Sequence, residues 1–209
     1  ELCRRGSRDR YYLGVVLPRG FGKTVSASKS APLWMHLDEP DMTTMLYSAT
    51  SALAADILIA IEAVMAGDNE DSWFTWLYGN WKTGSKDWTK RFCNHSYRKA
   101  SNISEPSFDS TAQDIGLTGY HPRMCVVDDP IIANKLRDEG IYMTAVHTGV
   151  DAIYNALQTN GLLMFVLTRY LDEDVAGKHF KEEGVASWTG MEMPSIAFSV
   201  HVQSASASA

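Results

Sequence analysis

Residues 17–24, with the sequence LPRGFGKT, have the residue types of a phosphate-binding loop. Gly20 and Gly22 allow the backbone to curl so that successive N–H groups point toward one centre, and a helix beginning there adds the partial positive charge of its N-terminus. In such a loop the lysine, here Lys23, reaches the β- and γ-phosphates, and the hydroxyl of Thr24 binds Mg²⁺. Leu17 stands where the standard motif G-x-x-x-x-G-K-[ST] has its first glycine. An ordinary glycine turn with a solvated lysine is the alternative.

Two consecutive carboxylates, Asp128 and Asp129, follow the apolar residues 124–127 and precede Pro130. A continuous apolar run is typical of a parallel strand that is buried on both faces, and ligands of open α/β sheets bind at the carboxyl ends of the strands. Mg²⁺ prefers oxygen ligands, so Asp128 is a candidate metal ligand, and Asp129 is placed to orient a water near the γ-phosphate. For the pair alone, a strand end followed by a turn is the alternative.

A third polar pair, Thr168 and Arg169, follows the apolar residues 162–167. A polar residue on a central strand beside the γ-phosphate can sense whether that phosphate is present. The alternative is a threonine hydroxyl that caps its own strand and a solvated arginine.

The elements that must position these residues alternate between strands and helices. Strands are predicted at 11–16, 43–48, 124–129, 162–167 and 191–194, with a short hairpin within 107–119. Helices are predicted from the loop toward residue 37 with a break at Pro32, and at 51–65, 134–158 and 173–183. The order predicts an α/β protein with a mainly parallel central sheet flanked by helices. The polar residues at three strand ends add the expectation of a P-loop NTPase (RecA-like/ASCE) fold. Residues 1–200 form the domain, 68–110 an inserted lobe, and 201–209 a flexible tail.

The lobe contains tryptophans at 73, 76, 81 and 88, interleaved with lysines and arginines. Aromatic and basic side chains together can stack on bases and neutralise phosphates. We favour the simpler interpretation, in which the tryptophans pack the lobe against the domain and the lysines are solvated.

The composition excludes some classes of protein. The 209 residues suffice for one domain with a substantial core, and the net charge of −6 argues against a wholly basic nucleic-acid module. Three scattered cysteines lack metal-binding spacing and fit a reducing compartment, and no apolar stretch has the length of a membrane span.

With these residues in view, the chain resembles the ATPase domain of the large terminase subunit of tailed bacteriophages. The likeness spans roughly residues 12–198, and four stretches carry it: 17–24, 118–131, 166–177 and 193–197. The first looks like the family's altered phosphate loop, which also carries an arginine. The second and third are similar to its acidic strand and its coupling motif.

The resemblance implies a role for each matching residue. ATP would lie on the loop residues Pro18, Arg19, Gly20, Phe21, Gly22, Lys23 and Thr24. Thr24 and Asp128 would hold Mg²⁺, and Asp129, at a position where many relatives have glutamate, would be the catalytic carboxylate. Arg19 would sense or stabilise the γ-phosphate, and Thr168 would couple hydrolysis to movement.

The resemblance also implies partners. Such a domain uses ATP to drive double-stranded DNA into a viral procapsid in the host cytoplasm, as a homo-oligomeric ring docked on the portal and assisted by the small terminase subunit. A neighbouring subunit could supply a second arginine, with Arg123, Arg137 and Arg169 as candidates. The family's nuclease domain is not expected in this chain, so no DNA cleavage is predicted.

Two other functions stay open. One is another DNA-translocating or helicase-like P-loop ATPase, which would share the loop, the acidic strand and the coupling residue. The other is a nucleotide-binding assembly module without turnover. A plain structural domain requires three coincidences at strand ends and is disfavoured.

Overall fold

The computed structural model describes residues 11–68, 72–82, 88–113, 119–132, 139–168, 175, 189–193 and 196–204. The strands are β1 (Tyr11–Val16), β2 (Thr44–Ser48), β3 (Phe92–Cys93), β4 (Phe108–Ala112), β5 (Met124–Asp128), β6 (Leu162–Leu167), β7 (Thr189–Met193) and β8 (Ile196–Ser204). The helices are η1 (Thr24–Ser30), α1 (Ala31–Asp38), α2 (Ser51–Ala66), α3 (Trp73–Tyr78) and α4 (Glu139–Ala156).

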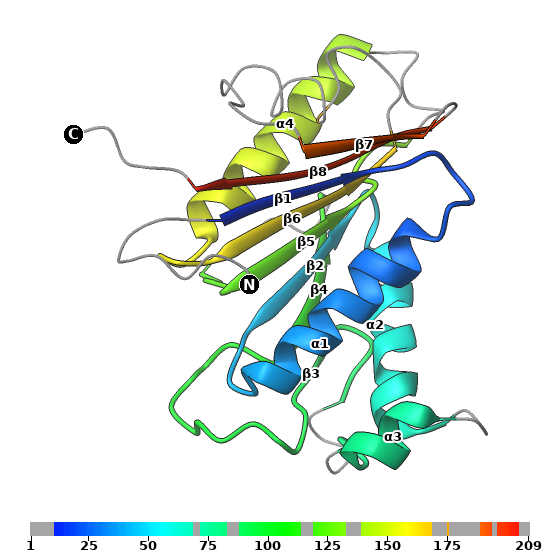
Figure 1. Ribbon diagram of the computed structural model, residues 1–209. Helices are drawn as coiled ribbons and strands as arrows, with labels where there is room; N and C mark the ends of the chain where they lie inside the picture. Colours follow the sequence, from blue (N-terminus) through cyan, green and yellow to red (C-terminus); the bar gives the residue numbers. More distant parts are fainter. Residues whose placement is uncertain are drawn as a thin grey trace.

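The strands form one sheet in the order β3-β4-β2-β5-β6-β1-β8-β7 (Figure 1). The neighbours β4, β2, β5, β6 and β1 run parallel, whereas β3 and β8 are antiparallel to their neighbours in that group. This confirms the α/β class and the mainly parallel sheet. Because parallel strands end at the same edge, the residues that follow β1, β5 and β6 come close together.

Helices cover both faces of the sheet, with α4 on one face and α1 and α2 on the other (Figure 1). Alternate residues of β5 point to opposite faces, so Cys125 and Val127 pack with α4 while Met124 and Val126 pack with α1 and α2. Both faces of the sheet are therefore buried, which explains why β5 and β6 have continuous apolar sequences.

The helix after the phosphate loop consists of two segments that meet at Pro32. The first, η1, is a π-helix, and the N–H of Ala31 donates to the carbonyl of Ser26, five residues back. Pro32 has no N–H to donate to the carbonyl of Ser28 and its ring crowds that carbonyl, so a regular α-helix cannot run through this point. The predicted break at Pro32 therefore takes the form of a wider turn.

The C-terminal part of the sheet differs from the prediction. The strand expected at 191–194 corresponds to β7. Strand β8 was not predicted. Residues 201–204, which were assigned to a flexible tail, form the end of β8. β8 pairs with β1 along the whole length of β1, from Tyr11 opposite Ser204 to Val16 opposite Ser199. The sequence IAFSVHVQS of β8 alternates apolar and polar residues, which is a strand signal.

Three further predictions differ from the structure or lie partly outside the described residues. Residues 108–112 are not part of a hairpin that leads into β5, because β4 pairs in parallel with β2 inside the sheet. The helix predicted at 134–158 is α4 over Glu139–Ala156, and the part at 133–138 lies outside the described residues. Of the helix predicted at 173–183, residue 175 alone is described, and it is helical.

The lobe after α2 is packed by some of its tryptophans and not by others. Trp81 is buried and Trp88 is partly buried, as predicted, whereas Trp73 and Trp76 on α3 are 72% and 75% exposed. The packing prediction was therefore wrong for these two. A six-residue helix cannot bury all its aromatic side chains, and Phe74 is the one that contacts Trp81.

A buried histidine pair joins the lobe to α1. The Nδ1 atom of His36 lies 3.0 Å from Nε2 of His95, and Nε2 of His36 lies 2.9 Å from Oγ1 of Thr44. His36 also stacks on Phe108. Burial lowers the pKa of His36 well below its ordinary value and lowers the pKa of His95 to about 4, and the nearby charge of Arg98 acts in the same direction on both.

Among the helices of the described ranges, none is both long enough and apolar enough to cross a membrane.

The histidine pair predicts a loss of stability in mild acid. Between about pH 6.5 and about pH 4, His95 takes up a proton in the unfolded chain but not in the folded protein, so the free energy of unfolding falls as the pH falls. Each proton that only the unfolded chain takes up lowers the free energy of unfolding by up to about 1.4 kcal/mol per pH unit. In urea unfolding measured across this range, His95→Gln should flatten the pH dependence, because the amide can bond to His36 without titrating.

His121, an exposed histidine that contacts the carbonyl oxygen of Ala156, is the matched control. His121→Gln keeps the buried pair intact, so it should retain the fall in the free energy of unfolding that His95 causes. A pH dependence that His95→Gln does not change would contradict a buried neutral pair.

Candidate active site

The loop between β1 and η1 has the left-handed backbone that its glycines permit. Gly20 has φ 84° and Gly22 has φ 70°, values at which a side chain is strained. The N–H of Leu17 donates to the carbonyl of Leu167 at 3.1 Å, and Gly22 accepts from the N–H of Ser26 at 3.0 Å. The loop is thus held by β6 at one end and by η1 at the other, and the helix begins at Thr24.

Lys23 lies between the ends of β5 and β6. Its ammonium nitrogen is 2.7 Å from Oδ2 of Asp129 and donates to Oγ1 of Thr168 at 2.7 Å. The lysine side chain is 8% exposed, so its charge depends on these two partners. Lys23 therefore forms one polar cluster with two residues that follow it by more than a hundred positions in the sequence.

Asp129 is fixed by β6 and carries backbone strain. Its side chain accepts from the N–H of Thr168 at 2.8 Å and from the Thr168 hydroxyl at 3.2 Å, and its own N–H donates to Val166 at 2.9 Å. Its φ is 37°, which is unusual for a residue with a side chain and more so before a proline. Strain of this kind costs on the order of 1–3 kcal/mol and concentrates at functional sites.

Asp128 forms a second polar cluster next to the first. Its carboxylate accepts from Oγ1 of Thr24 at 3.2 Å and from Oγ of Ser28 at 2.7 Å, and its main-chain carbonyl accepts from Oγ of Ser48 at 2.8 Å. Burial raises the pKa of Asp128, and the charge of Asp129 adds to the rise. The hydrogen bonds from Ser28 and Thr24 and the charge of Lys23 oppose it.

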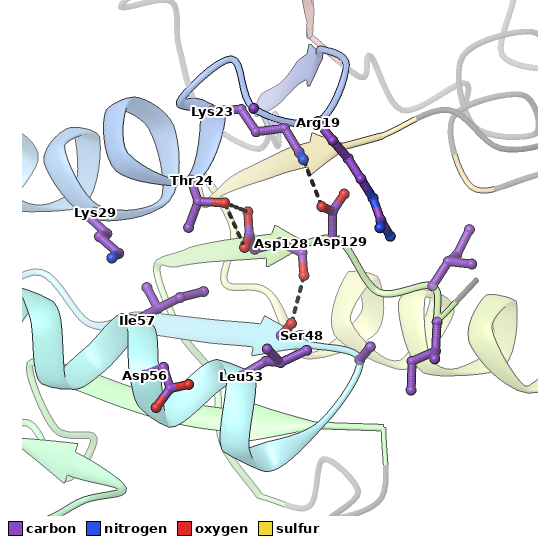
Figure 2. A pocket seen from close by; sticks show the side chains of 14 residues that line it. Arg19, Lys23, Thr24, Lys29, Ser48, Leu53, Asp56, Ile57, Asp128 and Asp129 are labelled. Atoms are coloured by element: carbon purple, nitrogen blue, oxygen red, sulfur yellow. Dashed lines mark hydrogen bonds and ion pairs between the residues drawn. The ribbon is translucent and has the colours of Figure 1, made fainter. Parts of the chain in front are cut away.

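Both clusters line a cavity of about 470 Å³ at the carboxyl edge of the sheet. This volume is in the range of pockets for small molecules and cofactors. Figure 2 shows Lys23 directed at Asp129, with Thr24 directed at Asp128 beside them. The cavity is also lined by Arg19, Gly20, Lys29, Ser48, Ala49, Leu53, Asp56, Ile57, Ile131 and Ile132.

The structure brings most of the predicted site residues together. Arg19, Gly20, Lys23, Thr24, Asp128 and Asp129 line the cavity, and Thr168 joins through Lys23 and Asp129. Pro18, Phe21 and Gly22 are exposed parts of the same loop but do not line the cavity.

Of the three arginines considered for a subunit contact, only Arg123 is among the described residues, and it lies apart from this group. Arg123 precedes β5, at the opposite end of the strand from Asp128, and pairs with Glu39 at 2.9 Å. Arg137 and Arg169 lie outside the described residues.

Sequence reasoning missed two serines and the α2 side of the cavity. Ser28 follows Thr24 by four residues, a spacing that places both on one helix face, and Ser48 ends a predicted strand, so both had a signal. Leu53, Asp56 and Ile57 reach the cavity through the packing of α2 against η1, which local sequence does not indicate.

The oxygens of Thr24 and Asp128 fit a magnesium site. Mg²⁺ takes oxygen ligands, keeps several waters and is commonly held by one or two carboxylates together with substrate phosphates. Within the described ranges no group of three or more His, Cys, Asp or Glu side chains could hold a metal ion. A site of one carboxylate and one hydroxyl therefore suits Mg²⁺ bound with a phosphate ligand better than a metal held by protein alone.

The fold and the cavity define an α/β protein with an open, mostly parallel sheet and a polar pocket at the carboxyl ends of its strands. No protein-family model matches the chain, and no curated protein matches it at a significant level.

The loop geometry predicts the cost of adding a side chain at Gly22. A Cβ there has no atom within 4 Å, so Gly22→Ala should act through backbone strain alone and lower the free energy of unfolding by about 1–2 kcal/mol. Urea unfolding measures this difference. Gly140, an exposed helical glycine that also has open space, is the matched control, and Gly140→Ala should be neutral or stabilise by up to about 1 kcal/mol. Equal stability of Gly22→Ala and the wild type would contradict the left-handed loop.

Proposed function

We propose that the chain is a P-loop ATPase domain, and that it serves as the ATP-hydrolysing motor domain of a viral terminase large subunit. The observation that carries the first part is the meeting of Lys23, Thr24, Asp128 and Asp129 at one cavity, where Lys23 and Asp129 also bond to Thr168. These groups suit a hydrolase for nucleoside triphosphates: a cation for phosphate, a hydroxyl and a carboxylate for the metal, and a carboxylate that can orient water.

The strand order supports this proposal. β6 lies between β1, which leads into the loop, and β5, which ends at the acidic pair. Thr168 is therefore delivered between Lys23 and Asp129, where a polar side chain can respond to the γ-phosphate. The central parallel strands with helices on both faces are compatible with the P-loop NTPase (RecA-like/ASCE) fold.

The proposed reaction is phosphoryl transfer from ATP to water. Phosphate groups entering the cavity meet the N–H groups of the loop and the ammonium of Lys23, which exchanges Asp129 for phosphate oxygens. Asp129, still held by the N–H of Thr168, is then able to orient a water and accept its proton. Arg19 lines the same cavity and adds positive charge. Mg²⁺, when bound at Thr24 and Asp128, supplies charge neutralisation of the phosphate oxygens.

The resemblance in sequence supports the motor function and its partners. On that basis the proposed partners are double-stranded DNA, the portal, the small terminase subunit and further copies of the chain in a ring. The proposed location is the host cytoplasm, on the procapsid. An arginine supplied by a neighbouring subunit would make the isolated domain slow, since such a group is worth on the order of 10³–10⁵ in rate.

One observation favours a nucleotide-binding module without turnover as the second candidate. Asp129 is already engaged by Lys23 and Thr168, and it is one methylene shorter than the glutamate of many relatives. Both candidates bind the nucleotide, but only the ATPase hydrolyses it.

Steady-state ATP hydrolysis, with and without double-stranded DNA, tests the proposal. Lys23→Ala and Asp128→Ala should abolish hydrolysis, and Asp129→Asn should lower kcat by about 10²-fold or more because the proton acceptor is lost. DNA should stimulate the wild type. The exposed Lys90 is the control, and Lys90→Ala should keep the wild-type rate without DNA.

Hydrolysis that survives Lys23→Ala would overturn the ATPase assignment to this site. Magnesium-dependent binding that Lys23→Ala abolishes, without turnover in the wild type, would favour the second candidate. Hydrolysis that DNA does not change would count against the motor.

A further inference from the structure

Ser28 has a role at the site that the phosphate-loop pattern does not include. We propose, building on the proposed function, that Ser28 is a positioning residue for the metal: its buried hydroxyl fixes one carboxylate oxygen of Asp128 while the Thr24 hydroxyl is free to turn to Mg²⁺. Ser28 lies on η1, one turn beyond Thr24, and is fully buried.

The contacts of Asp128 distinguish the two hydroxyls. Oγ of Ser28 is 2.7 Å from Oδ1, the length of a strong bond to a carboxylate, whereas Oγ1 of Thr24 is 3.2 Å from both Oδ1 and Oδ2. Thr24 is thus shared loosely between the two oxygens. Ser28 holds one of them and leaves Oδ2 with the weaker contact.

Burial makes the Ser28 contact persistent. The side chain is closed off from water, so a hydroxyl that lost Asp128 would have no solvent to replace it, and such a loss costs roughly 1–3 kcal/mol. Thr24 is only partly buried and lines the cavity, so its hydroxyl can exchange the carboxylate for a ligand. Ser48 holds the main-chain carbonyl of Asp128 in addition, so Asp128 is fixed at its side chain and at its main chain without Thr24.

Magnesium binding depends on this orientation. Mg²⁺ demands near-ideal octahedral geometry, and groups that orient a ligand typically contribute 10–100-fold to metal affinity. Ser28 therefore acts on the metal through Asp128, the partner of its hydroxyl.

Binding of Mn²⁺ to the full chain with ADP, followed by electron paramagnetic resonance, tests the role without catalysis. Ser28→Ala should weaken Mn²⁺ binding by about tenfold. The affinity for ADP in EDTA should stay at the wild-type value, because the loop is unchanged. Ser28→Cys, whose thiol is somewhat larger and donates only weakly, should have a Mn²⁺ affinity between those of the wild type and Ser28→Ala.

Ser30 provides the matched control on the same helix. Its exposed hydroxyl donates to the carbonyl of Val25 and faces away from Asp128, so Ser30→Ala should leave both affinities unchanged. Wild-type Mn²⁺ affinity in Ser28→Ala, or an equal loss of ADP affinity with and without metal, would overturn the positioning role while the proposed function stands. A wild type that binds neither ADP nor Mn²⁺ with ADP would overturn both.

Discussion

The site depends on the contact between the ammonium of Lys23 and the carboxylate of Asp129, 2.7 Å apart and largely removed from water. A charge in such a place needs a partner, because an unpaired buried ion costs several kcal/mol. The partner can reach Lys23 only because β6 separates β1 from β5 by a single strand, and β6 in turn holds Asp129 through the N–H of Thr168. The loop conformation, the strand order and the strained backbone of Asp129 are all required for this one contact.

In the proposed ATPase, the same contact would give the site two states. In the structure, Asp129 neutralises Lys23. A phosphate group would offer Lys23 more negative charge than one carboxylate does, and Asp129 would then become available as a proton acceptor while its main chain stays fixed. Phosphate binding and activation of the carboxylate would thereby be coupled through a single side chain. Asp128 is separate from this exchange because its partners are hydroxyls, and it can keep its place while Lys23 changes partner.

Much of the site could be predicted because its residues follow apolar strands, and parallel strands end at one edge. The loop, the acidic pair and Thr168 were found in this way, and β1, β2, β5 and β6 lie where the patterns placed them. The errors have physical causes. β4 has a polar centre and is stabilised by pairing with β2, a tertiary contact, so its local sequence did not indicate a buried strand. Trp73 and Trp76 are exposed because they lie three residues apart on one side of α3, whereas Phe74 contacts Trp81. The histidine pair and the α2 wall of the cavity arise from tertiary packing, which no local pattern encodes.

Equilibrium binding of ATP in excess Mg²⁺ tests the exchange of partners at Lys23 most directly, using the wild type, Asp129→Asn and Lys23→Ala. If Asp129 and phosphate compete for the ammonium, Asp129→Asn must bind ATP more tightly than the wild type, since the competing carboxylate is gone, and Lys23→Ala must lose binding. Weaker or equal binding by Asp129→Asn, or undiminished binding by Lys23→Ala, would contradict the account.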